Sequence, residues 1–129
     1  MAEEAPIDPD RPIIDPHMHL WDTRAHSPGG ERYFADDAAA EIAASGHRVT
    51  HSVFVQCHAM HSASGPEAMR PVGETRFVAG QAAISESGLY GPTLVGHRIV
   101  GTANLLLGDA VEPVLAAHVA AGDGRFRGI

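Results

Sequence analysis

Four short apolar segments alternate along the chain with three segments of helical length, and this alternation constrains the fold most. Strands separated by helices join as right-handed βαβ units in a parallel sheet. The predicted strands are residues 12–21, 47–57, 98–106 and 125–129. The predicted helices start at Asp36 or Asp37, at Pro71 and at Asp109, and stop at Gly46, Gly88 and Gly122. The alternation therefore predicts an α/β protein.

The predicted helix ends follow from residues that suit them. Proline is favoured at a first helical position, as at Pro71, and glycine just past a last turn. Glu112 lies three residues after Asp109, which is the spacing of a capping box. Clusters of Ser, Pro and Gly predict polar loops at residues 22–35 and 58–70.

The spacing of the strands suggests which α/β architecture is present. They begin near residues 13, 48, 98 and 125, and a (β/α)8 TIM barrel uses roughly 30 residues per unit. We therefore expect residues 13–129 to be the N-terminal half of such a barrel, truncated in strand four, after a flexible arm of residues 1–12. The alternative is a small open doubly wound sheet, but no Gly-rich phosphate loop follows the first strand.

Composition excludes several classes of protein. The 129 residues include 16 acidic and nine basic residues, all of the latter Arg, for a net charge of −7, which argues against nucleic acid as a partner. No apolar run approaches the roughly 20 residues of a membrane helix, and the acidic start does not resemble a signal peptide. A single cysteine, Cys57, excludes an internal disulfide. We expect a cytoplasmic protein.

Histidines at the end of the first strand are the strongest chemical signal. Asp15, His17 and His19 alternate, and a period of two predicts that all three lie on one face. Two imidazoles there can converge on one ion, and nitrogen ligands suit Zn²⁺ and other first-row divalent metals. The pair lies toward the carboxyl end of the strand, where barrel enzymes hold their active sites. We predict that His17 and His19 are metal ligands.

The segment from Ile14 to Asp22, Ile-Asp-Pro-His-Met-His-Leu-Trp-Asp, resembles the opening strand of the amidohydrolase superfamily, in its amidohydrolase-2 branch. Three later runs are similar to members of that branch: residues 51–60, 70–75 and 108–115. The resemblance covers nearly all of residues 13–129. The opening motif is the specific part, and the later runs identify no substrate.

The resemblance implies a (β/α)8 barrel that holds one divalent metal, most often zinc, with His17 and His19 as ligands. It implies further ligands on strands five and six, and an Asp on strand eight that also acts as general acid/base. A metal of this kind activates water and polarises a carbonyl. The implied activity is hydrolysis of a lactone, ester or amide in a small-molecule substrate, with non-oxidative decarboxylation as the alternative.

The chain as given contains no strand five, six or eight, so the resemblance assigns it no catalytic residue. We expect it to be an incomplete and inactive portion of a metal-dependent hydrolase, whose complete form could be a homo-oligomer. A non-catalytic truncated barrel is the main competing hypothesis. A third is an open βαβ module that binds a small anion at a helix N-terminus.

Other polar residues carry weaker signals. His58, His61, Glu67 and Arg70 lie in the predicted loop at the active-site mouth, where substrate contact is possible but solvated side chains are the commoner case. His51 and His118 are expected to be packed residues, and Cys57 a small buried apolar one. The remaining residues that we considered, without assigning them a role, are Trp21, His26, His47, His97 and Asn104.

Overall fold

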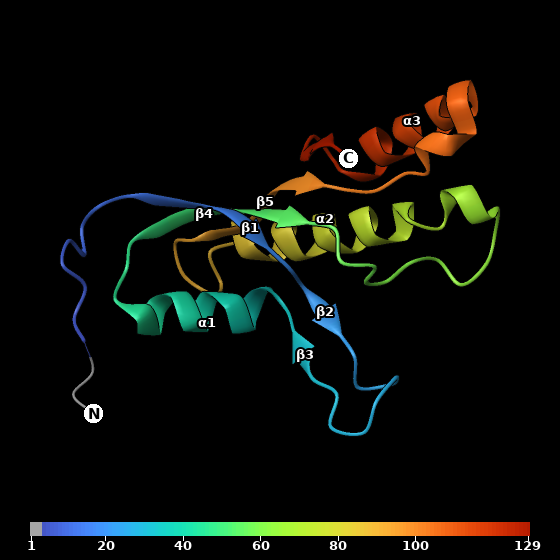
Figure 1. Cartoon of the computed structure of the whole chain (residues 1–129). Helices are drawn as coiled ribbons and strands as arrows, with labels where there is room; N and C mark the ends of the chain where they lie inside the picture. The colour runs from blue at the N-terminus through green and yellow to red at the C-terminus, as the bar shows by residue number, and fades with distance from the viewer. Residues whose placement is uncertain (1–3) are drawn as a thin grey trace.

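A computed structural model describes residues 4–129, and its centre is a sheet of four parallel strands (Figure 1). The strands are β1 (Ile13–Met18), β4 (Val49–Val55), β5 (Leu94–Val100) and β6 (Phe126–Gly128). They lie side by side in chain order, and each neighbouring pair is parallel. The predicted α/β class with a parallel sheet is confirmed.

Three α-helices connect these strands: α1 (Ala35–Ser45), α2 (Val72–Glu86) and α3 (Glu112–Ala121). Each crossover moves to the next strand in the same direction, and right-handed crossovers then place all the helices on one face. In agreement, α1 contacts α2 and α2 contacts α3 (Figure 1). The strand order has no reversal of the kind found in a doubly wound sheet. The described residues do not form a closed barrel.

The hydrophobic core lies between the sheet and the helices. Phe54 of β4 and Ile99 of β5 are fully buried there, beside Val78 of α2. Ser52 is also buried on this face, and its hydroxyl accepts a hydrogen bond from the Gly96 amide at 2.9 Å. Burial of these apolar side chains holds the helices against the sheet.

The opposite face of the sheet has no helix over it in the described chain. His51, Val53 and Val55 alternate with the buried residues of β4 and are only half-buried. Ile14 of β1 is 63% exposed. Residues 47–57 carry apolar side chains on both faces, as in a strand covered on both sides, whereas helices of the described residues cover only one face.

A short antiparallel hairpin lies where the sequence predicted only a polar loop. It joins β2 (Trp21–Asp22) to β3 (Arg32–Tyr33). The Trp21 and Tyr33 rings stack with centroids 4.9 Å apart and planes 19° apart. Strands of two residues are too short to leave a periodic pattern. The stacked rings link β2 to β3, and no local sequence pattern indicates this contact.

The third predicted strand is placed too late. Residues 98–106 were expected to form it, whereas β5 ends at Val100 and residues 105–111 form two 3₁₀ turns on either side of a kink at Gly108, together η2 (Leu105–Val111). The Asn104 side chain accepts a hydrogen bond from the Leu106 amide and turns the backbone. Leu106 is 96% exposed, so the apolar run that suggested a strand is not buried.

Most helix ends follow the predictions, but α1 begins at Ala35, before the predicted caps Asp36 and Asp37, and the start of α3 also differs. Gly46 terminates α1 with φ of 72°, and α2 differs from the predicted residues 71–87 by one residue at each end. Helix α3 begins at Glu112, not at Asp109. The predicted capping box is wrong, because η2 occupies residues up to Val111 and no side chain caps α3.

The predicted N-terminal arm begins with residues 1–3, which lie outside the described residues. Residues 4–12 contain no helix or strand. They run beside the turn between α1 and β4, where Arg48 donates a 3.3 Å hydrogen bond to the Asp10 carbonyl. Within residues 4–129, no helix combines the length and apolar character needed to cross a bilayer.

Candidate functional site

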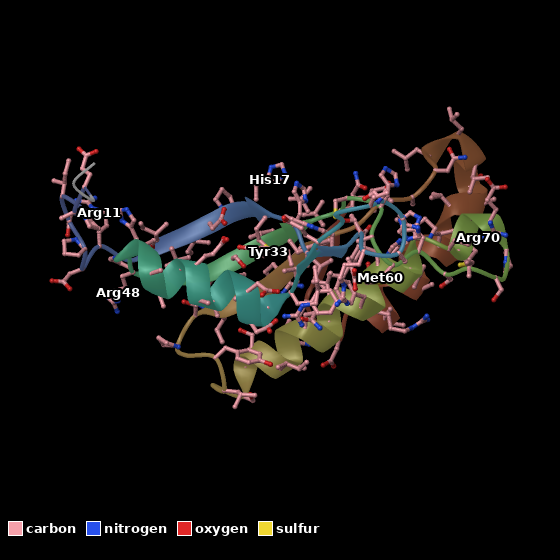
Figure 2. The ribbon with its side chains drawn as sticks, turned by 90° about the horizontal axis from the view of Figure 1, so that it is seen from below. Arg11, His17, Tyr33, Arg48, Met60 and Arg70 are labelled. Carbon is pink, nitrogen blue, oxygen red and sulfur yellow. The ribbon has the colours of Figure 1, made fainter. Side chains whose placement is uncertain are left out.

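The two predicted metal ligands meet at the carboxyl end of β1. The His17 and His19 rings are nearly perpendicular, at 87°, with centroids 4.9 Å apart. Their Nε2 atoms are 3.3 Å apart. Figure 2 shows His17 projecting away from the body of the molecule at the end of β1. The structure therefore brings together the side chains that the His-x-His spacing singled out.

An irregularity in β1 sets the direction of His17. Asp15 lies beside Ser52 and Met18 beside Phe54, so three steps of β1 match two of β4, which is the pattern of a β-bulge. The His17 amide donates a 3.0 Å hydrogen bond to the Asp15 carboxylate within it. Because Ser52 and Phe54 face the helices, Asp15 and Met18 do too. The prediction that Asp15 shares a face with His17 and His19 is wrong, because the extra residue changes the alternation.

His19 is oriented by the neighbouring strand. Its Nδ1–H donates a 2.8 Å hydrogen bond to the carbonyl of Val55, the last residue of β4. The ring also stands edge-on to Phe54, with centroids 6.4 Å apart. A proton on Nδ1 leaves the Nε2 lone pair of the neutral ring free, which is how backbone carbonyls orient metal-binding histidines.

The distance between the two Nε2 atoms can be compared with the distance between two nitrogen ligands of one zinc ion. Two nitrogens bound tetrahedrally to one Zn²⁺, each at about 2.0–2.1 Å, lie about 3.3–3.4 Å apart. The observed 3.3 Å fits this value. Among residues 4–129, no group of three or more His, Cys, Asp or Glu side chains is close enough to hold an ion. The pair thus fits a divalent metal as two ligands of a larger set.

A second group of polar residues follows β4 at the same edge of the sheet. The turn of residues 57–61 has two non-glycine residues with left-handed backbones, His58 at φ 64° and Met60 at φ 53°. Such conformations are uncommon and need support from the surroundings. Glu74 supplies it, because its Oε1 accepts hydrogen bonds of 2.9 Å from the amides of both Cys57 and Ala59.

Two cavities border this turn, and His61 lines both. One, of about 440 Å³, also has Trp21 and His58 in its wall. The other, of about 610 Å³, also has Arg70 and Asn104 in its wall. Figure 2 places Arg70 toward the end of the molecule beyond Met60. Residues that were expected to be solvated loop positions therefore line two half-open cavities.

Glu74 is the polar residue that sequence reasoning missed. It is 1% exposed, although glutamate is almost never buried without partners. It lies in the first turn of α2, where a carboxylate is also stabilised by the helix dipole. A first-turn glutamate in a sequence normally indicates only helix stabilisation. The contact with residues 57–61 is long-range and leaves no local signal.

His51, His118 and Cys57 were expected to be packed residues. His118 is fully buried: its Nε2–H donates to the Thr102 carbonyl at 3.0 Å, and its Nδ1 accepts from the Thr75 hydroxyl at 2.8 Å. The His51 ring lies beside that of His97, with centroids 4.8 Å apart. Burial, with the nearby Glu74 carboxylate, raises the pKa of the half-buried Cys57 thiol, which disfavours a nucleophilic thiolate.

Comparison with known proteins adds no relative to these observations. The chain matches no protein-family model, no curated protein and no solved structure. The geometry of its own residues is therefore what bears on function.

Proposed function

We propose that this chain is part of a metal-dependent hydrolase of the amidohydrolase type, in which His17 and His19 hold a divalent ion, zinc above all. A bound metal of this kind activates water and polarises a carbonyl group. The observation that carries the proposal is the 3.3 Å separation of the two Nε2 atoms, which suits two ligands of one ion. Lactones, esters and amides are the proposed substrates.

The residues of the chain itself have defined parts in this proposal. His17 projects from the sheet because of the bulge, and His19 is held by the Val55 carbonyl. Both lie at the carboxyl end of β1, and the carboxyl ends of the parallel strands are where α/β barrels bind their ligands. A sequential parallel sheet with its helices on one face suits the first half of such a barrel. Two ligands leave the coordination of the ion incomplete within the described residues.

A second candidate function is metal binding without catalysis. It is favoured by the finding that the described residues supply two ligands and no third. Hydrolysis of a lactone such as dihydrocoumarin by the zinc-loaded chain, lost in H17A/H19A, would reject the second candidate. Zinc binding without hydrolysis by this chain alone is expected of both candidates, because two ligands leave the site incomplete.

The metal assignment is tested by titrating Zn²⁺ against the wild-type chain and the variant H17A/H19A, with bound metal measured by mass spectrometry after desalting. We expect affinity to fall by at least about tenfold in the variant, because loss even of groups that only orient ligands costs that much. The control is H26A/H47A, which removes two exposed histidines and should bind as the wild type does. Equal zinc binding by wild type and H17A/H19A would reject the assignment.

A further inference from the structure

The side chains of His61 and Glu74 form a second pair at this edge of the sheet. His61 Nε2 lies 3.5 Å from Glu74 Oε2. Both atoms are buried, and neither has a hydrogen-bond partner among the described residues. A buried carboxylate oxygen without a donor is costly, so the facing imidazole nitrogen is the group expected to satisfy it.

The position of Glu74 is determined independently of His61. Its other oxygen accepts from the Cys57 and Ala59 amides, so the carboxylate cannot turn away without breaking both hydrogen bonds. Helix α2 and the turn are also in close contact at Gly73, where a Cβ atom would be 2.6 Å from the Met60 carbonyl oxygen. Oε2 is therefore held toward His61 by the backbone.

The His61 side chain also borders the two cavities. The side chain keeps 28% of its exposure although Nε2 is buried, and His61 contributes to the walls of both cavities. A neutral imidazole with its proton on Nε2 has an acceptor at Nδ1. A carboxylate that fixes this tautomer leaves the second nitrogen ready to take a proton, as in carboxylate–histidine pairs of hydrolases.

We propose that His61 is a proton-accepting residue directed at these cavities and that Glu74 is its positioning residue. The ligand is a molecule that presents an O–H group, water or an alcohol, to Nδ1. In hydrolysis, the proton passes from water to Nδ1 as the water oxygen forms a bond to the carbonyl carbon of the ester or lactone. The imidazolium, paired through Nε2–H with the Glu74 carboxylate, then gives this proton to the alkoxide that leaves when the carbon–oxygen bond of the substrate breaks. The use of this pair in hydrolysis rests on the proposed function, whereas the pairing of His61 with Glu74 is argued from their geometry alone.

The tautomer of His61 tests the pair directly. Long-range ¹H–¹⁵N spectra of the labelled chain at pH 8 should show the proton of His61 on Nε2. In E74Q the amide oxygen can keep both backbone hydrogen bonds, while the new NH₂ group faces His61 and requires Nε2 to accept. We therefore expect the proton to move to Nδ1. The control is E67Q, which removes a carboxylate from the wall of the larger cavity and should leave the Nε2–H tautomer unchanged.

A proton on Nδ1 in the wild type, or an unchanged tautomer in folded E74Q, would overturn the proposal. If E74Q does not fold, the tautomer of His61 in the wild-type protein is the measurement that supports or overturns the proposal. Where the zinc-loaded protein hydrolyses dihydrocoumarin, H61Q should lower kcat by about 100-fold with little change in KM or zinc content; an unchanged kcat would overturn the role of His61. Equal zinc binding by wild type and H17A/H19A, with the Nε2–H tautomer of His61 present, would count against the proposed function and leave the His61–Glu74 pair supported.

Discussion

The His17–His19 pair and the His61–Glu74 pair lie at the same edge of the sheet, yet their chemistry is opposite. In the first, two Nε2 atoms converge at 3.3 Å, and the backbone hydrogen bond of His19 directs a lone pair into the gap. In the second, a ring nitrogen faces a carboxylate oxygen at 3.5 Å. The two histidines can both direct lone pairs at a bound cation, and without one the Nε2–H tautomer of His17 can donate a hydrogen bond to His19 Nε2. The His61–Glu74 pair, a donor facing an acceptor, needs only a proton between its two atoms.

Burial explains why the two pairs differ. His17 is exposed at the edge of the sheet, where a metal and further ligands have access. Glu74 is buried behind the 57–61 turn, where an unpaired charge would be unfavourable. His118 is buried and both of its ring nitrogens form hydrogen bonds, so neither nitrogen is available to a ligand. His17 and His61 are therefore candidates for function because each has a ring nitrogen that forms no hydrogen bond with the described residues, whereas His118 has none.

The largest expected effect comes from Phe54→Ala, which removes the core side chain beneath His19. The ring is fully buried, so we expect the free energy of unfolding to fall by about 3–5 kcal/mol, measured by urea denaturation. Leu89→Ala is the control, because Leu89 is 72% exposed and should change stability by less than about 0.5 kcal/mol. Similar losses in the two variants would mean that Phe54 is not a core residue and that His19 lacks this support.

Gly73→Ala should disturb the His61–Glu74 side selectively. The added Cβ would be 2.6 Å from the Met60 carbonyl oxygen and 2.8 Å from the Ser62 amide, so we expect a loss of about 1–3 kcal/mol in unfolding free energy. Gly80→Ala in the same helix meets nothing within 4 Å and should stabilise by about 0.8–1 kcal/mol. Zinc binding by folded G73A should match the wild type; a G73A protein as stable as G80A would refute the close contact.

The smallest expected effect concerns His118. Burial lowers its pKa below the ordinary histidine value, although the Thr102 carbonyl and the Glu74 carboxylate oppose the change and His61 adds to it. The unfolded chain therefore binds more protons below about pH 6.5, so this contribution to stability is present above that pH and is lost as the pH falls. His118→Gln should reduce the loss on acidification by at most about 1.4 kcal/mol per pH unit. Parallel stability–pH curves for the two proteins would contradict this.

Local patterns in the sequence predicted most of the fold. The segments that became β4, α2 and β6 are near their predicted positions, because period and end residues reflect burial and capping within each segment. The errors fall where a local pattern was misleading. Apolar residues 105–107 are exposed in a 3₁₀ turn, and stacking of Trp21 on Tyr33 forms a hairpin that has no periodic signal.

The candidate site was predictable only in part, for a related reason. The spacing of His17 and His19 along one strand is local, so the sequence identified the pair without its geometry. The bulge that separates Asp15 from them depends on pairing with β4, which lies more than 30 residues away. The importance of Glu74 depends on contacts with residues 57 and 59, which α2 reaches only after it has packed.

The sequence by itself determined the alternation of strands and helices, the parallel sheet that follows from it, and the two histidines two residues apart at the end of the first strand. Only the tertiary structure decided that their Nε2 atoms converge, that Asp15 faces away from them, and that Glu74 meets His61 beside two cavities. The physical reason is range: hydrophobic period and capping act within one segment, whereas a site is formed by side chains that come together only when separate segments pack.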